Sequence, residues 1–321
     1  MTDIFISCDT ELSSSLHRKN ISAYDNFNKS IVGKTSQQDY GIFWQIQRLN
    51  HYGLKGVFFV DPMPALIYGT QILADIVQPI IASGHDVQMH IHTEWLEWVK
   101  DSPVNGQTGQ HIHCFSYEHQ KILLELARDL LKQAGAKKIT AFRAGNYGAN
   151  HDTLRALALL NIYYDTSFNH AYRGNPCLID ANHIIAPHNM MGVTQIPVSG
   201  LYDKKNRFRP AQICAMSVTE MTDAFYHAIK NDHAVFMMIT HSFEMLSRDR
   251  MRAKMSVVRR YERILEYIHK TGLTTKTFQN MDIHAYQNNL SHNICPAPAN
   301  MMRTFSRHIQ QAWGYIRYEW G

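Results

Sequence analysis

Short apolar runs alternate with segments of helical periodicity along most of the chain, and this alternation constrains the fold more than any other feature. About seven strands alternating with helices favour parallel strands joined by right-handed crossovers, in a barrel or an open sheet. Helices are expected at residues 38–51, 65–82, 116–133, 151–160, 218–230 and 250–270, and long polar loops at 12–38 and 93–115. Strand-sized runs lie at 3–11, 56–60, 138–145, 162–168, 195–199, 234–243 and 274–278, with a further strand inside 84–95.

Length and composition fit one barrel and argue against several classes of protein. A chain of 321 residues is long for one domain, but barrels of this kind reach that size as a single unit. No run approaches the roughly 18 apolar residues of a membrane span, and no basic segment precedes a long apolar one at the N-terminus. Five cysteines without paired spacing favour reduced thiols, and a net charge of +5 without a basic stripe argues against nucleic acid. We therefore expect a cytoplasmic protein.

The stretch GHDVQMHIHTEW at residues 84–95 predicts a strand that runs into a loop. Val87, Met89 and Ile91 alternate with polar residues, so a strand places the imidazoles of His90 and His92 together on the opposite face. Neutral imidazole is the commonest metal ligand, and a His-x-His pair at a strand end can chelate one ion. The alternative is a pair of structural histidines at a barrel mouth.

Polar side chains also gather at the carboxyl ends of the other predicted strands. In the first strand, Ser7, Asp9 and Glu11 share one face. Active sites of barrels of alternating strands and helices form at the rim where the strands end, so these side chains converge there. The convergence of several strands favours a site over isolated structural residues. The candidate residues at this rim are Asp9, Glu11, His90, His92, Arg143, Asp165 and His241.

The order and spacing of these motifs resemble one enzyme family. The motifs are CDTE at 8–11, GHDVQMHIHTEW at 84–95, FRAGNYG at 142–148, DTSF at 165–168, QIPVS at 195–199 and MMITHSFE at 237–244. They resemble the NodB-homology polysaccharide deacetylases of carbohydrate esterase family 4. The likeness is greatest to the WalW-like branch associated with lipopolysaccharide and surface polysaccharide synthesis. It covers roughly residues 3–282 and implies an α/β fold, a distorted (β/α)7 barrel.

The resemblance implies a hydrolase that removes an acetyl group from a sugar with the help of one divalent ion, usually zinc. Asp9 is then the general base, and His241 is the general acid that protonates the departing amine. Arg143 pairs with Asp9 and keeps it ionised, and Asp165 orients or tunes His241. The expected partner is an acetylated sugar or a lipid-linked or nucleotide-linked saccharide.

The expected metal ligands follow partly from the resemblance and partly from strand geometry. Thr10 occupies the position of the family's usual metal-binding acid, so the ligand role passes to Glu11, which the alternation of faces also favours. The family's histidines lie four residues apart, and four residues beyond His90 lies Glu94. The expected set is therefore Glu11, His90 and either His92 or Glu94.

Three residues are expected to contact the substrate. Backbone amides near Asn146 and Tyr147, in the FRAGNYG turn, would face the developing oxyanion. Trp95 is a candidate for the wall of a sugar-binding groove, and the alternative is that it packs under the long loop.

The chain is expected to divide into a barrel at 1–285 and a C-terminal extension at 286–321. The extension carries apolar residues at helical spacing, and we expect this stripe to dock onto the barrel. Contact with a membrane surface or with a partner subunit is the alternative. The stripe consists of Phe305, Ile309, Trp313, Ile316 and Trp320.

Two further points stay open at the level of sequence. The basic run DKKNRFRP at 203–210 fits a solvated loop, but it can also attract an acidic sugar or a diphosphate carrier.

Besides the sugar deacetylase, two other functions compete. One is a hydrolase of the same fold that acts on a non-sugar amide, and the other is an inactive barrel that binds sugar or serves as a scaffold. The joint presence of Asp9, Arg143 and His241 argues against the inactive barrel.

Overall fold

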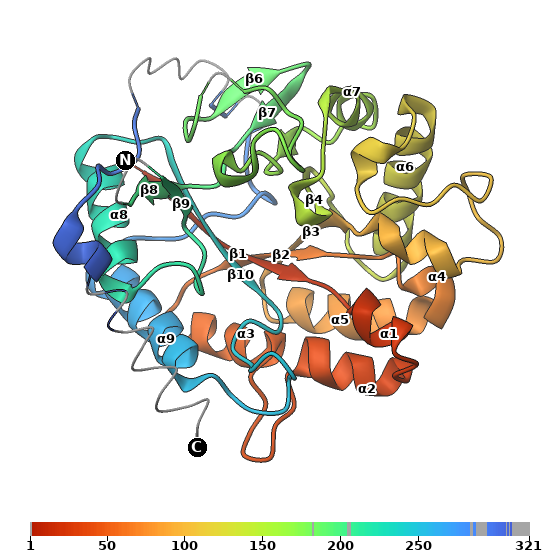
Figure 1. Cartoon of the computed structure of the whole chain (residues 1–321), viewed down its shortest axis with the longest axis horizontal. Helices are drawn as coiled ribbons and strands as arrows, with labels where there is room; N and C mark the ends of the chain where they lie inside the picture. Colours follow the sequence, from red (N-terminus) through yellow and green to blue (C-terminus); the bar gives the residue numbers. More distant parts are fainter. Residues whose placement is uncertain are drawn as a thin grey trace.

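Eight strands form one curled half-barrel sheet at the centre of the molecule (Figure 1), which confirms the predicted α/β class. The computed structural model describes residues 2–181, 183–203, 207–282, 285–286, 294–305, 307 and 309. The strand order is β10-β1-β2-β3-β4-β5-β7-β6, and all neighbours are parallel except β6 and β7. The strands are β1 (Asp3–Thr10), β2 (Gly56–Val60), β3 (Asp86–Ile91), β4 (Ala141–Ala144), β5 (Tyr164–Asp165), β6 (His188–Met190), β7 (Val193–Gln195) and β10 (Val235–His241). The hairpin of β8 (Gly200–Tyr202) and β9 (Phe208–Pro210) lies apart.

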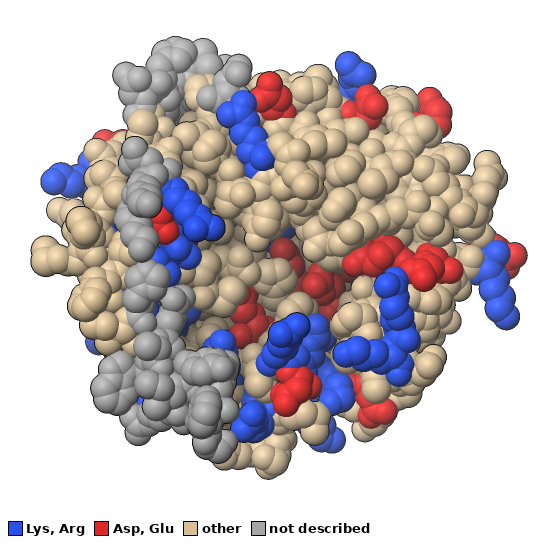
Figure 2. All heavy atoms as spheres, viewed as in Figure 1, with Lys and Arg blue, Asp and Glu red and all other residues tan. Residues whose placement is uncertain are grey.

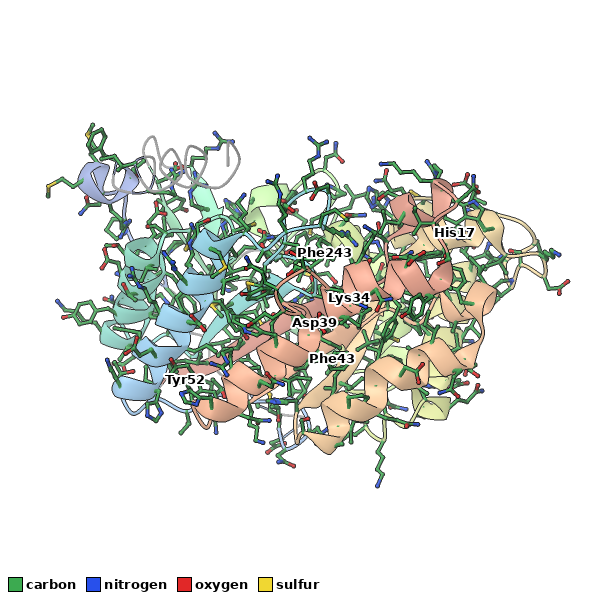
Figure 3. All side chains as sticks on the ribbon, turned by 90° about the horizontal axis from the view of Figure 1, so that it is seen from below. His17, Lys34, Asp39, Phe43, Tyr52 and Phe243 are labelled. Atoms are coloured by element: carbon green, nitrogen blue, oxygen red, sulfur yellow. The ribbon has the colours of Figure 1, made fainter. Side chains whose placement is uncertain are left out.

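Helices cover the outer face of this sheet. Figure 3 shows α3, with Phe43 near its start and Tyr52 after its end. This helix contacts α5 and α9. Among the described residues, no helix has both the length and the apolar character needed to cross a membrane. The helices are α1 (Ser14–Arg18), α2 (Ala23–Phe27), α3 (Ile42–His51), α4 (Ala65–Tyr68), α5 (Thr70–Ala82), α6 (Tyr117–Gln133), α7 (His151–Leu159), α8 (Val218–Lys230) and α9 (Met255–Lys270).

Alternation along the strands gives the sheet two different faces. Outward residues such as Ile4 and Ile6 of β1 belong to the large core shared with the helices. Inward residues form a separate small core, in which the Phe278 ring stacks 5.0 Å from the Phe5 ring and lies 5.3 Å from the Tyr164 ring. These rings fill the interior at the start of the strands. The polar residues of the inner face are thereby left to the carboxyl ends, where the sequence predicted the site.

The sheet closes on itself without a regular strand between β10 and β7. The Ser199 amide donates to Met237 O at 3.2 Å, and the Met237 amide donates to Ser199 Oγ at 2.9 Å. Further along, the Ile213 amide donates to Ile239 O at 3.0 Å. The described residues 196–203 and 207–213 therefore join β10 to the far side of the half-barrel.

Several expected elements differ from those observed. The predicted loop at 12–38 is wrong, because Ser13 and Ser22 cap the short helices α1 and α2. The helix predicted at 65–82 is interrupted at Gly69, whose φ of +87° is not helical. The strand predicted at 274–278 is reduced to a single bridge between Thr275 and Ile4.

The C-terminal segment packs in the opposite sense to the prediction. Residues 301–305 are helical, with Arg303 and Arg307 buried while Phe305 is 67% and Ile309 is 42% exposed. Arg307 Nε lies 2.9 Å from Glu220 Oε1 of α8, so ion pairs turn the cationic side inward and leave these two apolar residues outside. The prediction that the apolar stripe docks onto the barrel is therefore wrong for Phe305 and Ile309, which stay exposed. The rest of the stripe, Trp313, Ile316 and Trp320, lies outside the described residues.

The fold predicts that loss of the buried Gln88 side-chain amide lowers the stability of the protein strongly. Gln88 Oε1 accepts hydrogen bonds from the Thr140 amide at 2.9 Å and the Ala141 amide at 2.8 Å, which fixes the start of β4 against β3. Gln88→Leu leaves two buried amides without partners, so it should lower the free energy of unfolding by about 2–5 kcal/mol.

Chemical denaturation of both proteins measures this change. The control is Gln71→Leu, because the Gln71 side chain is exposed and donates a hydrogen bond to the exposed Asp75 within α5, and its effect should stay within about 0.5 kcal/mol. Equal stability of the two variants would contradict the structural role of Gln88.

Candidate active site

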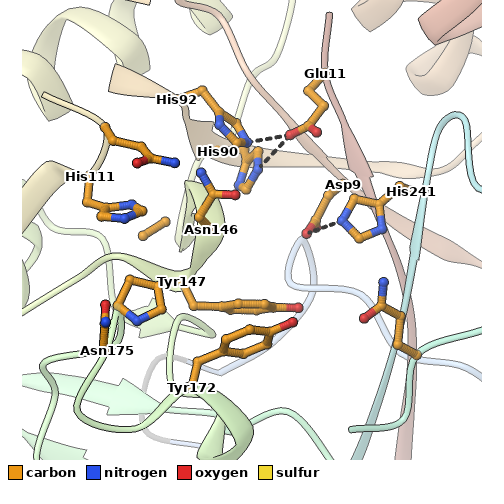
Figure 4. A pocket seen from close by; sticks show the side chains of 14 residues that line it. Asp9, Glu11, His90, His92, His111, Asn146, Tyr147, Tyr172, Asn175 and His241 are labelled. Atoms are coloured by element: carbon orange, nitrogen blue, oxygen red, sulfur yellow. Dashed lines mark ion pairs between the residues drawn. The ribbon is translucent and has the colours of Figure 1, made fainter. Parts of the chain in front are cut away.

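Strand register brings the predicted polar residues to one rim. Asp9 near the end of β1 pairs with His241 at the end of β10, and His90 of β3 pairs with Arg143 of β4. Since parallel strands in register place equivalent residues side by side, these four side chains meet inside the barrel. Figure 4 shows Asp9 and His241 on one side of a pocket, with Glu11, His90 of β3 and His92 just after β3 along its upper edge. The pocket encloses about 370 Å³.

Three side chains on the pocket wall form a cluster suited to a metal ion. Their donor atoms, one each from Glu11, His90 and His92, all lie within 4.8 Å of one another. Glu11 Oε2 lies 3.3 Å from His90 Nε2 and 2.5 Å from His92 Nε2. Two imidazole nitrogens and a carboxylate form a ligand set that zinc uses in catalytic sites, where a fourth position stays open.

Hydrogen bonds on the far side of each ring support this assignment. His90 Nδ1 lies 2.7 Å from Arg143 O, a carbonyl that can only accept, so Nδ1 carries the proton and Nε2 keeps its lone pair. His92 Nδ1 lies 2.9 Å from Glu94 Oε1. Glu94 therefore contacts a ligand rather than joining the cluster, and of the two alternatives left open by the sequence the geometry favours His92. The residues present fit a divalent ion.

Electrostatics within this cluster point the same way. Burial opposes ionisation of Glu11, but the neighbouring His92 and His90 hold its pKa well below the usual range. Burial also favours neutral His92, but Glu11 and Glu94 raise its pKa well above the usual value. A proton on His92 thus balances the two carboxylates, and a bound cation supplies the same compensation while releasing that proton.

Asp9 is held in place by a buried guanidinium. Arg143 is fully buried, and its Nη1 lies 2.5 Å from Asp9 Oδ1. Its remaining donors are also used, with Nε 2.8 Å from Thr166 Oγ1 and Nη2 3.0 Å from Ser7 Oγ. This leaves Asp9 Oδ2 facing the pocket, 3.9 Å from His241 Nε2. The predicted pairing of Arg143 with Asp9 is present.

His241 is held by a carboxylate that the sequence reasoning missed. Its Nδ1 lies 3.1 Å from Glu244 Oε2, and the same oxygen accepts the His241 amide at 2.9 Å. Burial favours the neutral ring, but Glu244 and then Asp9 raise the pKa of His241 to about 9. The imidazole is therefore protonated at neutral pH. The sequence contained a signal for this contact. Glu244 follows His241 by three residues in THSFE, a spacing that brings two side chains together across one turn.

Two predicted site residues lie elsewhere. Asp165 does not orient His241, because its carboxylate accepts from the Ser167 hydroxyl at 2.6 Å and the Ser167 amide at 3.0 Å. Trp95 does not line the pocket. It is fully buried, with its ring 5.7 Å from that of Trp98, so the alternative of packing under the loop is the observed one.

The remaining pocket wall comes from the FRAGNYG turn and the turn that follows β5. Asn146 and Tyr147 line the pocket as expected, and both have left-handed φ, 53° and 60°, which is strained for a tyrosine. The Tyr147 ring stacks 5.1 Å from the Tyr172 ring (Figure 4). Burial raises the pKa of Tyr147, and its hydroxyl is a buried donor without a partner among the described residues. Sequence reasoning missed Tyr172, His111 and Gln212 as lining residues.

No protein-family model matches the sequence, and a search of curated proteins found no match either. Solved structures do resemble the fold. A candidate polysaccharide deacetylase from Mycobacterium smegmatis aligns with a TM-score of 0.52 at 13% identity, over 88% of this chain and 94% of that one. A family 4 carbohydrate esterase from Streptomyces lividans in complex with acetate aligns with a TM-score of 0.46 at 10% identity, over 92% and 98%.

A 4-alpha-glucanotransferase from Thermococcus litoralis also resembles the fold. It aligns with a TM-score of 0.50 at 10% identity over 99% of this chain, which spans 46% of that enzyme. Proteins with different activities thus share the curled barrel, and at these identities the likeness establishes the fold alone.

The ligand cluster predicts an order of metal affinities. His90→Ala and His92→Ala each remove a ligand and should reduce zinc affinity by at least about 100-fold, whereas Glu94→Ala removes only a partner of His92 and should cost about 10–100-fold. Competition with a chromophoric chelator measures each dissociation constant.

The control is His51→Ala, an exposed histidine at the end of α3, which should leave affinity unchanged. If Glu94→Ala lost zinc as completely as His90→Ala while His92→Ala retained it, Glu94 would be the third ligand.

Proposed function

We propose that this protein is a metal-dependent hydrolase that removes an acetyl group, in the first instance an N-acetyl group, from a sugar. One observation carries the proposal. A carboxylate paired with a buried guanidinium, Asp9, and an imidazole whose pKa is raised to about 9, His241, lie beside a cluster of two histidines and a glutamate that fits a divalent ion. The fold shared with carbohydrate-active proteins supports it.

Asp9 is suited to act as general base. A zinc ion bound at the cluster would supply Lewis-acid polarisation of the acetyl carbonyl. The Asp9 carboxylate is aimed into the pocket by Arg143, so Oδ2 can take the proton of an attacking water. Arg143 fixes the direction of this carboxylate, since each of its three nitrogens makes a hydrogen bond of its own.

His241 is suited to act as general acid. The amine of a hydrolysed amide departs only when it is protonated, and His241 Nε2 lies on the same side of the pocket as Asp9, 3.9 Å from its Oδ2. Glu244 accepts at Nδ1, which fixes the ring and leaves Nε2 as the nitrogen that delivers a proton. One side of the pocket therefore carries a base and an acid held by separate partners.

The opposite wall is suited to hold the substrate. Tyr172 is 39% exposed and stacked on Tyr147, which offers an aromatic face to a sugar ring. The Tyr147 hydroxyl stays protonated because burial raises its pKa, and the backbone amides of the turn at Asn146 are suited to face the acetyl oxygen. These contacts favour a sugar over a small non-sugar amide, which would leave the aromatic face unused.

The proposal extends to the setting of the reaction. The motif resemblance to the WalW-like branch supports a substrate from lipopolysaccharide or surface polysaccharide biosynthesis, as a lipid-linked or nucleotide-linked saccharide. Such precursors are cytoplasmic, in agreement with the expected location. In this setting, residues 1–285 supply the catalytic barrel and residues 286–321 an extension.

Release of acetate from N-acetylated sugars tests the activity. Wild-type protein loaded with zinc should release acetate, and Asp9→Asn and His241→Ala should each lower kcat by about 100-fold or more while zinc remains bound. The matched control is His227→Ala on the exposed side of α8, which should retain full activity.

Two results would separate the competing functions. Zinc binding without acetate release from any sugar would favour the inactive sugar-binding barrel. Release of ammonia or an amine from non-sugar amides, with acetylated sugars left intact, would favour the other hydrolase.

The pKa of His241 predicts the alkaline limb of the pH profile. The acid must be protonated, and its pKa of about 9 lies above the ordinary value, so kcat should stay high below that pH and fall as pH rises through it. Glu244→Gln removes the carboxylate that raises this pKa and should move the alkaline limb to lower pH. A limb that stayed in place in Glu244→Gln would contradict the assignment of His241 as the acid.

A further inference from the structure

A second cavity, of about 450 Å³, adjoins the candidate active site. Tyr172 and Gln212 line both cavities, so a ligand can extend from one into the other. The second cavity is built from the turn that contains His170 and Tyr172 and from the β8–β9 hairpin, which contributes Arg207 and Arg209. The metal cluster, Asp9 and His241 are not part of its lining.

The charge of this second cavity is positive. Two guanidinium groups, those of Arg207 and Arg209, line it, and no carboxylate does. Arg209 Nη2 lies 2.7 Å from Asp203 Oδ2, and its Nη1 donates to Ala215 O at 3.3 Å, which fixes the plane of the guanidinium. Asp203 Oδ2 also lies 3.8 Å from Arg307, which in turn contacts Glu220, so each of these two guanidinium groups has a carboxylate. Arg209 is thereby held at the cavity wall, where its buried Nε has no hydrogen-bond partner among the described residues.

Arg207 adds an unneutralised charge at the edge of the cavity. Its side chain is exposed, and no ion pair joins it to any acid in the part of the chain that the structure describes. A guanidinium that is not committed to a carboxylate of the protein is available to a ligand. Figure 2 shows Lys and Arg atoms on the left flank of the central hollow, over the region that Figure 1 labels β8 and β9.

The opposite flank has a different charge. A cavity of about 530 Å³ meets the active site at Gln110 and is lined by Glu94 and Glu97. Its lining also holds Lys19 and Arg18, and Arg18 Nη2 lies 2.5 Å from Glu97 Oε2, so acids and bases balance there. The active-site pocket itself contains carboxylates, which Figure 2 shows as acidic atoms within the hollow. The arginine flank therefore differs from both in having guanidinium groups and no carboxylate among its described lining residues, which favours an anionic substrate group.

We propose that the second cavity binds an anionic group of the substrate, so that the preferred substrate is an acidic saccharide rather than a neutral one. This inference rests on the proposed function, because it identifies the substrate class of the same site. A planar guanidinium recognises a carboxylate or a phosphate through paired hydrogen bonds, so a uronic acid and a sugar phosphate share the required chemistry. The charge asymmetry also sets which way the saccharide lies across Tyr172.

Titration calorimetry with full-length protein tests the site without turnover. The Asp9→Asn variant, loaded with zinc, is titrated with N-acetylglucosamine, N-acetylglucosamine 1-phosphate and N-acetylglucosaminuronic acid. At least one acidic ligand should bind roughly tenfold more tightly than the neutral one, as expected for a charge-assisted hydrogen bond. The ligand with the larger gain identifies phosphate or carboxylate as the group that is recognised.

Variants then locate the effect. Arg207→Gln should abolish the preference without changing affinity for the neutral sugar, and Arg209→Lys should reduce it because the forked geometry is lost. Arg18→Gln, on the opposite flank, is the matched control and should keep the preference. Equal binding of all three ligands, or a preference that survives Arg207→Gln, would overturn the inference.

Acetate release by the wild-type protein separates this inference from the proposed function. Selective binding of acidic sugars without acetate release would support the anionic site and contradict the proposed deacetylase activity. Acetate release at equal kcat/KM from neutral and acidic sugars would retain the deacetylase and overturn the anionic site.

Discussion

The buried guanidinium of Arg143 is the interaction on which the rest of the site depends. From β4 it reaches Asp9 and Ser7 on β1 and Thr166 just after β5, and the Ser7 hydroxyl continues to Met238 O on β10. One charge thus ties together strands from both sides of the curled sheet. Removing a partner from a buried ion pair is strongly destabilising, about 3–5 kcal/mol, because it leaves an uncompensated charge. Asp9, the proposed general base, is therefore part of the hydrogen-bonded framework of the barrel.

Charge compensation also explains how the metal cluster and the acid coexist in a small pocket. Two carboxylates, Glu11 and Asp9, point into it, and each has its own cationic counterpart. His241 keeps its proton because Glu244 lies behind the ring, outside the pocket lining. Asp9 and His241 lie 3.9 Å apart, and each is held by a partner of its own, Arg143 and Glu244.

Sequence reasoning succeeded where the two-residue alternation of a strand determines the direction of a side chain. It failed where neighbouring residues compete with distant ones for a hydrogen bond. Alternation along β1 and β3 predicted which residues face the interior, and Glu11, His90 and His92 do meet there. Asp165 was expected beside His241, but it sits two residues before a serine whose amide and hydroxyl capture its carboxylate. Short-range hydrogen bonds of this kind form before any distant partner can compete.

By itself, the sequence determined the α/β class, the rim at the carboxyl ends of the strands and most of the side chains gathered there, because periods of 2 and 3.6 residues are local properties. Only the tertiary structure decided that His92 rather than Glu94 completes the cluster and that Glu244 holds His241. It also decided that the β8–β9 hairpin brings its arginines beside the pocket. These outcomes depend on distances between segments far apart in the chain, which are fixed by closure of the sheet and by burial of charge.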